Sequence, residues 1–338
     1  MTEGKGAVVS ALANDFNIHV RVGGCNAGHT IFHEGVKYKM QIIPCGWTNP
    51  NAFLVIGRGA IVNIDLLMEE IHLLEKVDPK IKNRILIDKY AGVLSQDFVQ
   101  EEGHTNGELH QRIGSTGEGV GAARVARINR DPGKFKRIID WADNYQLGSM
   151  LHDTVNIINN LNMSGSNVLL EGTQGCGLSL IHGPWPYVTS ADTNAGQLIA
   201  DCGISPLAVN QIILVARTFP IRVAGNSGPL AGETSWEEMS TKLGKEVVEH
   251  TTVTKKVRRI GKWDEALMAM AVKINRPTSI ALTFMDYLNP EDEGKTEYDQ
   301  LSNQSIRFVE YLEKDFRTRV SMIKTGEANE HIIRRGDI

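Results

Sequence analysis

The chain has 338 residues, 41% of them hydrophobic, and a formal net charge of −4 at pH 7. This length and apolar content are sufficient for one large domain or two, with a sizeable core. The charge balance lacks the basic excess typical of proteins that bind nucleic acids. No apolar run reaches membrane-spanning length and no signal peptide is visible, so we expect a cytoplasmic protein with no nucleic-acid or membrane partner.

Hydrophobic periodicity predicts strands and helices that alternate along the chain. In the first half, the expected elements in chain order are a helix over 7–13, a strand over 18–22, a hairpin over 31–43 that turns near Glu34-Gly35, a strand over 53–56, a helix over 65–76, a strand over 85–88 and mostly helical structure over 135–162. In the second half, the expected strands are 168–171, 212–215, 221–223, 279–283 and 319–323. Three expected helices begin at Ala195, Ser235 and Asp264, and a fourth spans 299–314.

This alternation favours one continuous α/β domain over residues 1–338, because the sequence shows no internal repeat, low-complexity tract or proline-rich linker. We expect a mostly parallel central sheet that is flanked by helices, with loop and hairpin insertions. Ser235 and Glu238 have the spacing of a capping box, which predicts the helix start at that point.

The four cysteines are scattered and none has C-x-x-C spacing: they are Cys25, Cys45, Cys176 and Cys202. We interpret them as free thiols of a reducing compartment. Two of them, Cys25 and Cys176, lie in glycine-rich loops, where a nucleophile fits the pattern less well than a small filler side chain.

Two glycine-rich loops near the N-terminus give the first indication of function. Glu3-Gly4-Lys5-Gly6 precedes an expected helix, and Gly23 to Thr30 follows an expected strand. Glycines let backbone N–H groups approach a ligand, and such groups together with a lysine favour phosphate. The amide of Asn26 suits a heterocycle edge, and the imidazole of His29 suits an acid or a charge stabiliser. Together the loops predict chemistry on a phosphorylated heterocycle, although each alone also fits a tight turn or a surface histidine.

Further segments have the same polar, glycine-rich character. Gly114 to Gly121 places hydroxyls among glycines ahead of three arginines, which fits a phosphate site or a flexible surface loop. Gly172-Thr173-Gln174-Gly175 follows a predicted strand, which is where open α/β sheets bind ligands. The basic loop 251–259 fits a carboxylate clamp or a solvated charge run. Asp286, just past a predicted strand, fits recognition of a guanine-like base or a loop cap.

These segments, in this order, resemble the adenylosuccinate synthetase family in its short, archaeal-like form, and the resemblance covers nearly the whole chain. The matching segments are Glu3-Gly4-Lys5-Gly6, Gly23 to Thr30, Gly114 to Gly121, Gly172-Thr173-Gln174-Gly175, Pro186 to Ser190, Thr251 to Gly261 and Lys324-Thr325-Gly326. The resemblance implies a P-loop-related fold, a Mg²⁺ cofactor and a homodimer in which an arginine of each subunit reaches the other's nucleotide phosphate. In the implied reaction, a nucleoside triphosphate phosphorylates O6 of a 6-oxopurine monophosphate, and the amine of L-aspartate then displaces phosphate.

The resemblance also implies roles for the matching residues. Lys5 contacts phosphates, Asn26 faces the purine O6, and His29 acts as an acid and stabilises the charge on O6. The implied triphosphate site comprises Glu3, Gly4, Lys5, Gly6, Gly28, His29, Thr30, Thr283, Asp286, Lys324, Thr325 and Gly326, and the Gly28 carbonyl also binds Mg²⁺. The implied purine monophosphate site comprises Thr2, Asn26, Ser115, Thr116, Gln174 and Thr189, with Arg127 or Arg130 from the partner subunit. The implied aspartate site comprises Val253, Thr254, Lys256 and Arg258.

Three departures from the family pattern concern specificity. Thr2 stands where the family has an aspartate that is both the catalytic base and a Mg²⁺ ligand, so Thr2 holds the catalytic and metal position without a carboxylate. A hydroxyl cannot act as a carboxylate base at neutral pH. Thr283-Phe284-Met285-Asp286 replaces Thr-Lys-x-Asp, so an aromatic residue stands where a lysine recognises guanine. Lys256 replaces an arginine that approaches the ribose 2′-hydroxyl.

These departures resemble a phage branch of the family, the 2-aminoadenylosuccinate synthetases, which use dGMP instead of IMP and ATP or dATP instead of GTP. Thr2 leaves room for the 2-amino group of guanine, loss of the 2′-hydroxyl contact suits a deoxynucleotide, and loss of the lysine suits ATP. We therefore hypothesise that dGMP, L-aspartate and ATP are the substrates, in the diaminopurine pathway of a phage. Two alternatives stay open: an adenylosuccinate synthetase that acts on IMP with GTP, and an inactive nucleotide-binding protein.

The family also has an apolar strand ahead of the lysine loop, whereas this sequence begins at the loop itself. Either that strand is missing or the true start lies upstream of residue 1. If it is missing, we expect the central sheet to lack a strand, which would affect both stability and activity.

Overall fold

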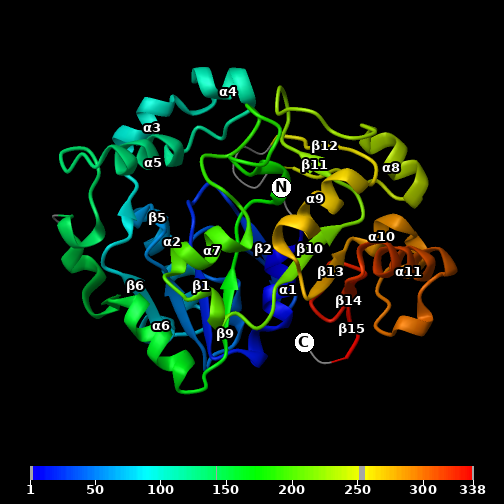
Figure 1. The fold of residues 1–338 in the computed structure, drawn as a ribbon, viewed down its shortest axis with the longest axis horizontal. Coiled ribbons are helices and arrows are strands. Elements are labelled where there is room, and N and C mark those ends of the chain that lie inside the picture. Colours follow the sequence, from blue (N-terminus) through cyan, green and yellow to red (C-terminus); the bar gives the residue numbers. More distant parts are fainter. Residues whose placement is uncertain (1–2, 142, 251–255, 337–338) are drawn as a thin grey trace.

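The computed structural model describes residues 3–141, 143–250 and 256–336. It confirms the expected α/β fold, with mostly parallel sheets flanked by helices (Figure 1). The parallel strands form two groups: a five-stranded sheet in the order β8-β6-β4-β1-β9 and a four-stranded sheet in the order β10-β13-β14-β15. Every strand of the first sheet is parallel to its neighbours, and β15 runs antiparallel to β14 at the edge of the second.

The strands match the expected segments closely. The five-stranded sheet comprises β1 (Ile18–Arg21), β4 (Phe53–Ile56), β6 (Ile85–Asp88), β8 (Leu151–His152) and β9 (Val168–Glu171). The four-stranded sheet comprises β10 (Ile213–Arg217), β13 (Ser279–Thr283), β14 (Arg319–Lys324) and β15 (Ile332–Arg334). Three two-stranded pairs are insertions: the expected hairpin of β2 (His29–His33) and β3 (Val36–Met40), then β5 (Ile61–Val62) with β7 (Gly92–Val93), and β11 (Ile221–Arg222) with β12 (Arg259–Ile260).

The helices begin at side chains that cap them. Ser235 accepts a hydrogen bond from the backbone N of Glu238, and Asp264 accepts one from Leu267, as their N-cap positions predict. The helices are α1 (Lys5–Ala11), α2 (Ile64–Glu75), α3 (Gln96–Glu102), α4 (Glu108–Ile113), α5 (Val120–Asn129), α6 (Thr154–Met163), α7 (Ala195–Cys202), α8 (Trp236–Leu243), α9 (Glu265–Asn275), α10 (Met285–Leu288) and α11 (Asn303–Phe316). Among the described residues, no helix combines the length and apolar character needed to cross a membrane.

The expected helical stretch 135–162 is largely wrong. Only α6 is α-helical there, and the described residues before it form short 3₁₀ helices at Ile138–Asp140 and Asn144–Met150. Gly148, with φ 50° and ψ −126°, breaks the helical path, and the Asp153 side chain accepts a hydrogen bond from Asn156 and so begins α6. Capping and backbone geometry thus overrule the apolar spacing in this stretch.

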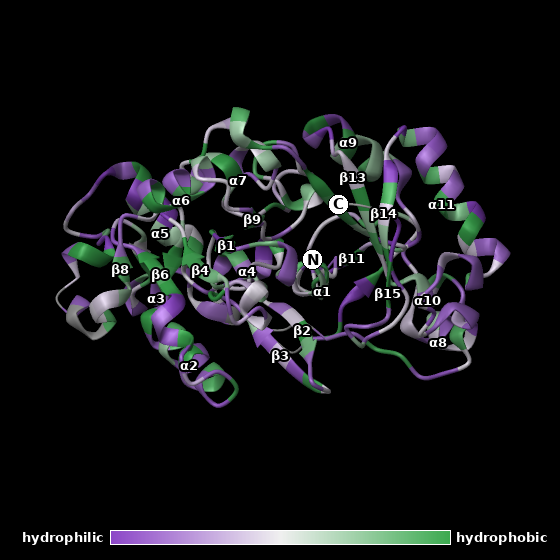
Figure 2. Cartoon of the chain, turned by 90° about the horizontal axis from the view of Figure 1, so that it is seen from below, coloured by the Kyte–Doolittle hydropathy of each residue, from purple (hydrophilic) through white to green (hydrophobic). Residues whose placement is uncertain are grey.

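Apolar residues concentrate on the strands and on the helix faces that cover them, as Figure 2 shows. Leu54, Val55 and Ile56 of β4 are at most 1% exposed, because helices cover both faces of this parallel sheet. Each such side chain contributes about 1.5–3 kcal/mol by burial. The sheets therefore form a rigid base for the loops at their edges.

A cavity of about 990 Å³ lies between the two sheets. Side chains of both facing edge strands line it: Val168, Leu169 and Leu170 of β9, and Ile213, Leu214, Val215 and Ala216 of β10. Among the described residues, β9 pairs only with β1 and β10 only with β13 on the strand ladders. Each of these two strands therefore has one free edge along the cavity.

Candidate active site

The carboxyl ends of the parallel strands meet at one edge of the sheets, and most of these strands end in a charged or hydroxyl residue. These last residues include Arg21 (β1), Glu171 (β9), Arg217 (β10), Thr283 (β13) and Lys324 (β14). In open α/β sheets, ligands bind at this edge, next to the loops that follow the strands. The predicted site loops all start from these strand ends or lie beside them.

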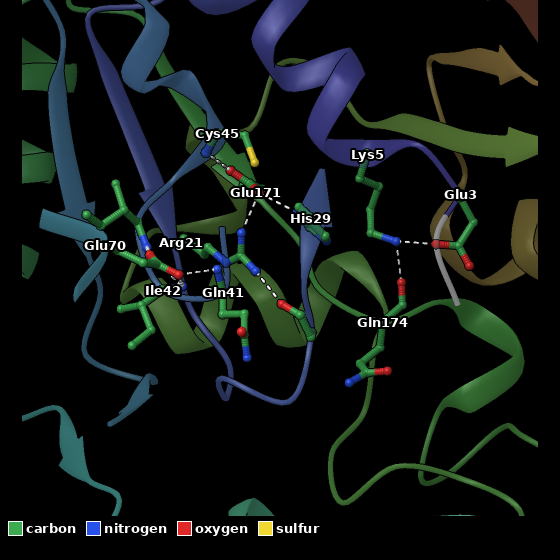
Figure 3. A network of polar contacts seen from close by, with 12 residues as sticks. Glu3, Lys5, Arg21, His29, Gln41, Ile42, Cys45, Glu70, Glu171 and Gln174 are labelled. Atoms are coloured by element: carbon green, nitrogen blue, oxygen red, sulfur yellow. Dashed lines mark hydrogen bonds and ion pairs between the residues drawn. The ribbon is translucent and has the colours of Figure 1, made fainter. Parts of the chain in front are cut away.

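The lysine loop crosses this edge at the start of α1. Gly4 is the N-cap of the helix and adopts φ +83°, a conformation that glycine tolerates best. The ammonium of Lys5 forms an ion pair with Glu3 and donates a hydrogen bond to the backbone carbonyl of Gln174 (Figure 3). Lys5, which the sequence assigns to the triphosphate, thus contacts Gln174, which it assigns to the purine monophosphate.

Close packing joins the lysine loop to its neighbours. A Cβ on Gly6 would lie 2.9 Å from the carbonyl oxygen of Thr30 and 3.0 Å from the Cβ of His29, so a larger residue would push α1 away from β2. The hydroxyl of Thr283 donates a hydrogen bond of 2.6 Å to the carbonyl of Glu3. The structure thereby brings Thr283 and the first glycine loop together, as the sequence predicts.

His29 belongs to a buried polar network at the ends of β1 and β9 (Figure 3). Its Nδ1 lies 2.5 Å from Oε1 of Glu171, and Nη1 of Arg21 donates to the same oxygen at 2.9 Å. The other carboxylate oxygen accepts from the backbone N of Cys45 at 2.7 Å. Arg21 donates a further bond of 2.6 Å from Nη2 to the carbonyl of Ala27, inside the second glycine loop. One carboxylate thus holds the histidine, the arginine and a backbone amide.

Electrostatics decide the charge states in this network. Burial alone would raise the pKa of the Glu171 carboxyl, but the charge of Arg21 and the hydrogen bond from His29 outweigh it and lower that pKa. Burial lowers the pKa of His29, and the charge of Arg21 lowers it further. At neutral pH the site therefore holds an ionised Glu171 and a neutral imidazole, with Nδ1 as the donor.

Several residues predicted to bind the purine nucleotide line the mouth of the cavity. Asn26, Gln174 and Thr189 line it together with Glu3 and Lys5. Gln174 adopts φ 64°, which is uncommon outside glycine and fixes its carbonyl toward Lys5. The structure therefore assembles these five side chains, from four separate segments, around one space.

Other residues predicted for the monophosphate are absent from the lining of that cavity. The Ser115 hydroxyl accepts a 3.3 Å bond from the backbone N of Gly117, and Thr116 is half-buried in the same loop. Arg127 of α5 lies over the ring of Phe135, and Arg130 is exposed at the end of that helix. The single chain therefore does not bring these residues to the cavity, and their assigned roles stay predictions.

Of the residues predicted to bind aspartate, Val253 and Thr254 lie outside the described residues, as does Thr2, which is predicted for the catalytic, monophosphate and metal positions. Lys256 is exposed, with Nζ 2.9 Å from Nε2 of His110. Arg258 is buried, and its Nε donates to the carbonyl of His250 at 3.1 Å. Of the two predicted cations, Arg258 is thus the buried one.

A second acidic residue organises the arginines near the aspartate loop. The carboxylate of Glu249 pairs with Arg217 at 2.5 Å and lies 3.9 Å from Nε of Arg258. Burial lowers the pKa of Arg258, and Glu249 opposes that effect. The two guanidinium groups therefore share one carboxylate close to the end of β10.

The residues predicted for the triphosphate base gather at the ends of β13 and β14. Asp286 of α10 and Lys324 are both buried. Burial raises the pKa of Asp286 to about 6, and burial lowers the pKa of Lys324 to about 8, with each charge partly offsetting the effect on the other. Thr325 donates a bond of 2.6 Å to the carbonyl of Lys295, and a Cβ on Gly326 would lie 2.6 Å from His331. This corner is therefore compact and buried, and none of these residues lines the cavity between the sheets.

Phe284, which replaces the family lysine, lies in an aromatic cluster. Its ring is 5.8 Å from Phe219 and 5.4 Å from Tyr287, centroid to centroid. The guanidinium of Arg217 sits 3.8 Å from the centroid of Phe284 and 4.2 Å from that of Phe219. An apolar, cation-covered surface thus occupies the position from which a lysine would contact a base.

The cysteines are free, as expected. Burial raises the pKa of Cys25 to about 12 and raises the pKa of Cys176 as well. The thiolate, which is the nucleophilic form, is therefore scarce at neutral pH, and these side chains act as small fillers.

The sequence did not indicate three residues of the site. These are Arg21, Glu171 and Arg217, and the last two line the cavity together with Arg124, one of the arginines that follow the third glycine loop. Arg21 and Glu171 end apolar strands, and a charged residue at the end of a buried strand is the signal that could have revealed them. Their pairing, however, depends on β1 and β9 lying side by side.

Three comparisons relate the chain to known proteins. The sequence profile of the family "Adenylosuccinate synthetase" matches residues 2–147 and 134–295. The adenylosuccinate synthetase of Pyrococcus horikoshii is 38% identical over 338 residues, covering 99% of this chain and 96% of that protein. The enzyme of the same name from Methanococcus maripaludis is 38% identical over 334 residues, covering 98% and 95%.

Two solved structures have a similar fold. A fully ligated adenylosuccinate synthetase from Plasmodium falciparum superposes with a TM-score of 0.86 at 22% identity, covering 99% of this chain and 97% of that one. The succinoaminodeoxyadenylate synthetase of cyanophage S-2L, bound to dGMP and dATP as an energy donor, superposes with a TM-score of 0.82 at 26% identity. The second match covers 99% of this chain and 92% of the phage protein.

Proposed function

The chain belongs to the adenylosuccinate synthetase family and is a carbon–nitrogen ligase, and on that premise we propose that it joins L-aspartate to C6 of dGMP with ATP or dATP as the phosphoryl donor. The products are N6-succino-2-amino-2′-deoxyadenylate, ADP or dADP, and phosphate. This reaction would supply the diaminopurine deoxynucleotide pathway of a phage.

The position of Phe284 is the observation that supports ATP or dATP, instead of GTP, as the phosphoryl donor. Its ring packs against Phe219 and Tyr287 under the guanidinium of Arg217, so the site offers an aromatic surface instead of a lysine. A phenyl ring has no N–H group that could donate a hydrogen bond to the O6 of guanine, as the ammonium of a lysine can. Together with the buried Asp286, it supports an adenine nucleotide as the donor.

The choice of dGMP as acceptor is supported by sequence positions. Thr2 leaves space where the family has an aspartate, and Lys256 replaces the arginine that approaches the ribose. The cyanophage enzyme, whose fold this chain shares, was solved with dGMP and dATP. A deoxyguanylate acceptor and an adenine-based donor fit all three features.

The chemistry follows from the need for a better leaving group. An oxo group leaves poorly from a purine C6, whereas a phosphate leaves readily. The donor phosphorylates O6, and the aspartate amine then adds at C6 and phosphate departs. In this scheme Lys5 holds the transferred phosphate, Asn26 orients O6 and His29 stabilises the negative charge there, while Arg258 binds a carboxylate of aspartate bidentately.

A magnesium ion fits the donor atoms near the second glycine loop. Mg²⁺ prefers oxygen ligands and often takes only one or two from the protein, with the rest from phosphates and water. The half-buried Gly28 offers a backbone carbonyl of this kind. The one His/Cys/Glu group that the described residues bring together, His29 with Cys45 and Glu171, carries nitrogen and sulfur donors and is bonded to Arg21, so it does not fit Mg²⁺. When bound, the ion would neutralise charge on the phosphates.

We also propose a homodimer, in which Arg127 or Arg130 of one subunit reaches the phosphate of the acceptor in the other. Arg127 lies on α5 and Arg130 caps the end of that helix, and neither lines the cavity of its own chain. Arg130 is exposed, which leaves its guanidinium accessible to a second subunit.

A second candidate is ordinary adenylosuccinate synthesis from IMP and GTP. It is favoured by the archaeal relatives of that name, which are 38% identical to this chain over nearly its full length. The third reading, an inactive nucleotide-binding protein, is favoured by the loss of the carboxylate at Thr2. The assembled contacts of His29 and Lys5 argue against that reading, because an unused site has no reason to retain them.

A matrix of substrate pairs tests the proposal. The protein is incubated with L-aspartate and Mg²⁺ plus each combination of dGMP or IMP with ATP, dATP or GTP, and released phosphate and succinylated product are measured. We expect turnover with dGMP and ATP or dATP. Turnover with IMP and GTP alone would establish the second candidate, and binding without turnover in every combination would establish the third.

A further inference from the structure

Glu171 is a buried carboxylate that the scheme above does not use, and it lies directly behind His29. Its side chain is fully buried and accepts bonds from Arg21 and from the backbone N of Cys45. Because these two groups only donate, Glu171 is held as an acceptor, and the histidine nitrogen that faces it must carry the proton. We propose that Glu171 is a positioning residue that fixes the imidazole of His29 with its proton on Nδ1 and leaves Nε2 for the purine O6; this inference rests on the proposed role of His29.

Arg21 completes the arrangement from the neighbouring strand. Arg21 and Glu171 are paired residues in the parallel register of β1 and β9, so the sheet itself sets the distance between them. The same guanidinium donates to the carbonyl of Ala27, in the loop that carries Asn26. The orientation of the histidine and the position of the O6-facing loop therefore depend on one ion pair.

The negative charge of Glu171 also matters for the chemistry. An anion hydrogen-bonded to one nitrogen of an imidazole increases the proton affinity of the other nitrogen. As negative charge develops on O6, Nε2 of His29 accepts the proton that the purine N1 loses; the resulting imidazolium donates a hydrogen bond to O6, and Glu171 stabilises its positive charge. A neutral amide in the same place would provide neither the tautomer nor the charge.

The test replaces Glu171 with glutamine in the full-length protein. E171Q has one amide oxygen for the two carboxylate positions, of which Arg21 and His29 share one and the backbone N of Cys45 uses the other. Because the backbone N–H of Cys45 is fixed whereas the side chains of Arg21 and His29 can adjust, we expect the oxygen to face Cys45 and the NH₂ group to face His29, so that the proton moves to Nε2. ¹⁵N NMR of the histidine ring reports this tautomer directly and does not require activity. With whichever substrate pair the enzyme uses, we expect kcat to fall by about 10²-fold or more and KM for nucleotides to change little. In a plot of kcat against pH, the limb that reports protonation of His29 (the pH limb) should shift to lower pH.

Glu70, a buried carboxylate of α2, provides a matched control. It accepts bonds from the backbone N of Gln41 at 2.5 Å and of Ile43 at 2.8 Å, and it has no contact with His29 among the described residues. E70Q should leave the tautomer and the pH limb unchanged. A loss of kcat in E171Q with the wild-type tautomer and pH limb would show a merely structural role and overturn the inference.

Glu171→Asp keeps the test decisive if E171Q does not fold. It retains the negative charge opposite Arg21 but withdraws the carboxylate by one methylene group. We expect a smaller loss of kcat and a pH limb between those of wild type and E171Q; an unchanged limb and tautomer would overturn the proposal. If the wild type turns over no substrate pair but the tautomer responds as expected, the positioning role stands and the proposed function fails.

Discussion

The hydroxyl of Thr283 donates a hydrogen bond of 2.6 Å to the carbonyl of Glu3, although 280 residues separate them. This bond joins the end of β13, where the donor base is predicted to bind, to the loop that is predicted to hold its phosphates. A Cβ on the next residue, Gly4, would already lie 3.0 Å from Cγ2 of Thr283. The base and phosphate parts of the predicted triphosphate site are therefore fixed relative to each other. A substitution in either part should change kcat/KM for the nucleoside triphosphate.

Phe284→Lys should move donor preference toward GTP. The variant restores the family pattern Thr-Lys-x-Asp, whose lysine donates to the O6 of guanine. The backbone at position 284 has φ 60°, so phenylalanine and lysine have to adopt the same unusual conformation there. We expect the ratio of kcat/KM for GTP over ATP to rise by about tenfold, the scale of one hydrogen bond to a charged group. Phe284→Leu is the control, and an equal rise in that variant would show that loss of the ring, rather than gain of the lysine, is responsible.

Donor binding should depend on pH through Asp286. Burial raises the pKa of this carboxyl to about 6, so the group is ionised above that pH and protonated below it. Guanine donates N1–H and N2–H to an ionised carboxylate, so GTP affinity should fall as the pH drops from 8 to 5.5, whereas the N1 of adenine accepts from the protonated form and ATP affinity should be maintained. Calorimetric titrations at both pH values measure this, and Asp286→Asn should abolish the difference. Equal pH dependence for both nucleotides would refute base recognition by Asp286.

His29→Ala should abolish chemistry and spare binding. Loss of a group that stabilises charge on O6 is expected to lower the rate of phosphate release by about 10²–10⁴-fold. Nucleotide affinities, measured by calorimetry, should stay within a few-fold, because Lys5 and the glycine loops are untouched. The exposed His72 of α2 serves as the control, since His72→Ala should change neither quantity. A loss of nucleotide binding in His29→Ala without a separate loss of rate would contradict the assigned role.

Arg258→Leu should impair the use of aspartate far more than the use of nucleotides. Removing a charge-assisted contact costs about 1.5–3 kcal/mol, so we expect the KM for aspartate to rise by roughly 10- to 100-fold. Arg259→Leu is a matched control, because the neighbouring guanidinium pairs with Glu233 near the surface. Initial rates at varied aspartate measure the effect, and the same KM in both variants would remove the clamp assignment.

Local sequence patterns were sufficient for most elements and for the chemical character of the site. The strands at 53–56, 85–88, 168–171 and 279–283 were predicted with their observed bounds, because apolar runs between polar loops leave little choice. The glycine loops, with Lys5, Asn26 and His29 among them, indicated a phosphorylated heterocycle. The helical prediction over 135–162 failed, because Gly148 and the cap at Asp153 decide that stretch and apolar spacing does not.

Only the tertiary structure decided which of these residues meet. Lys5 contacts the carbonyl of Gln174, and Glu171 lies against His29 and Arg21, because parallel strands far apart in the sequence end at the same edge of a sheet. No local pattern encodes that adjacency, since the order of strands in a sheet is set by long-range packing. The sequence by itself therefore determined the family and the reacting groups. The fold determined that Glu171 lies against His29, and this contact places the proton of the neutral imidazole on Nδ1.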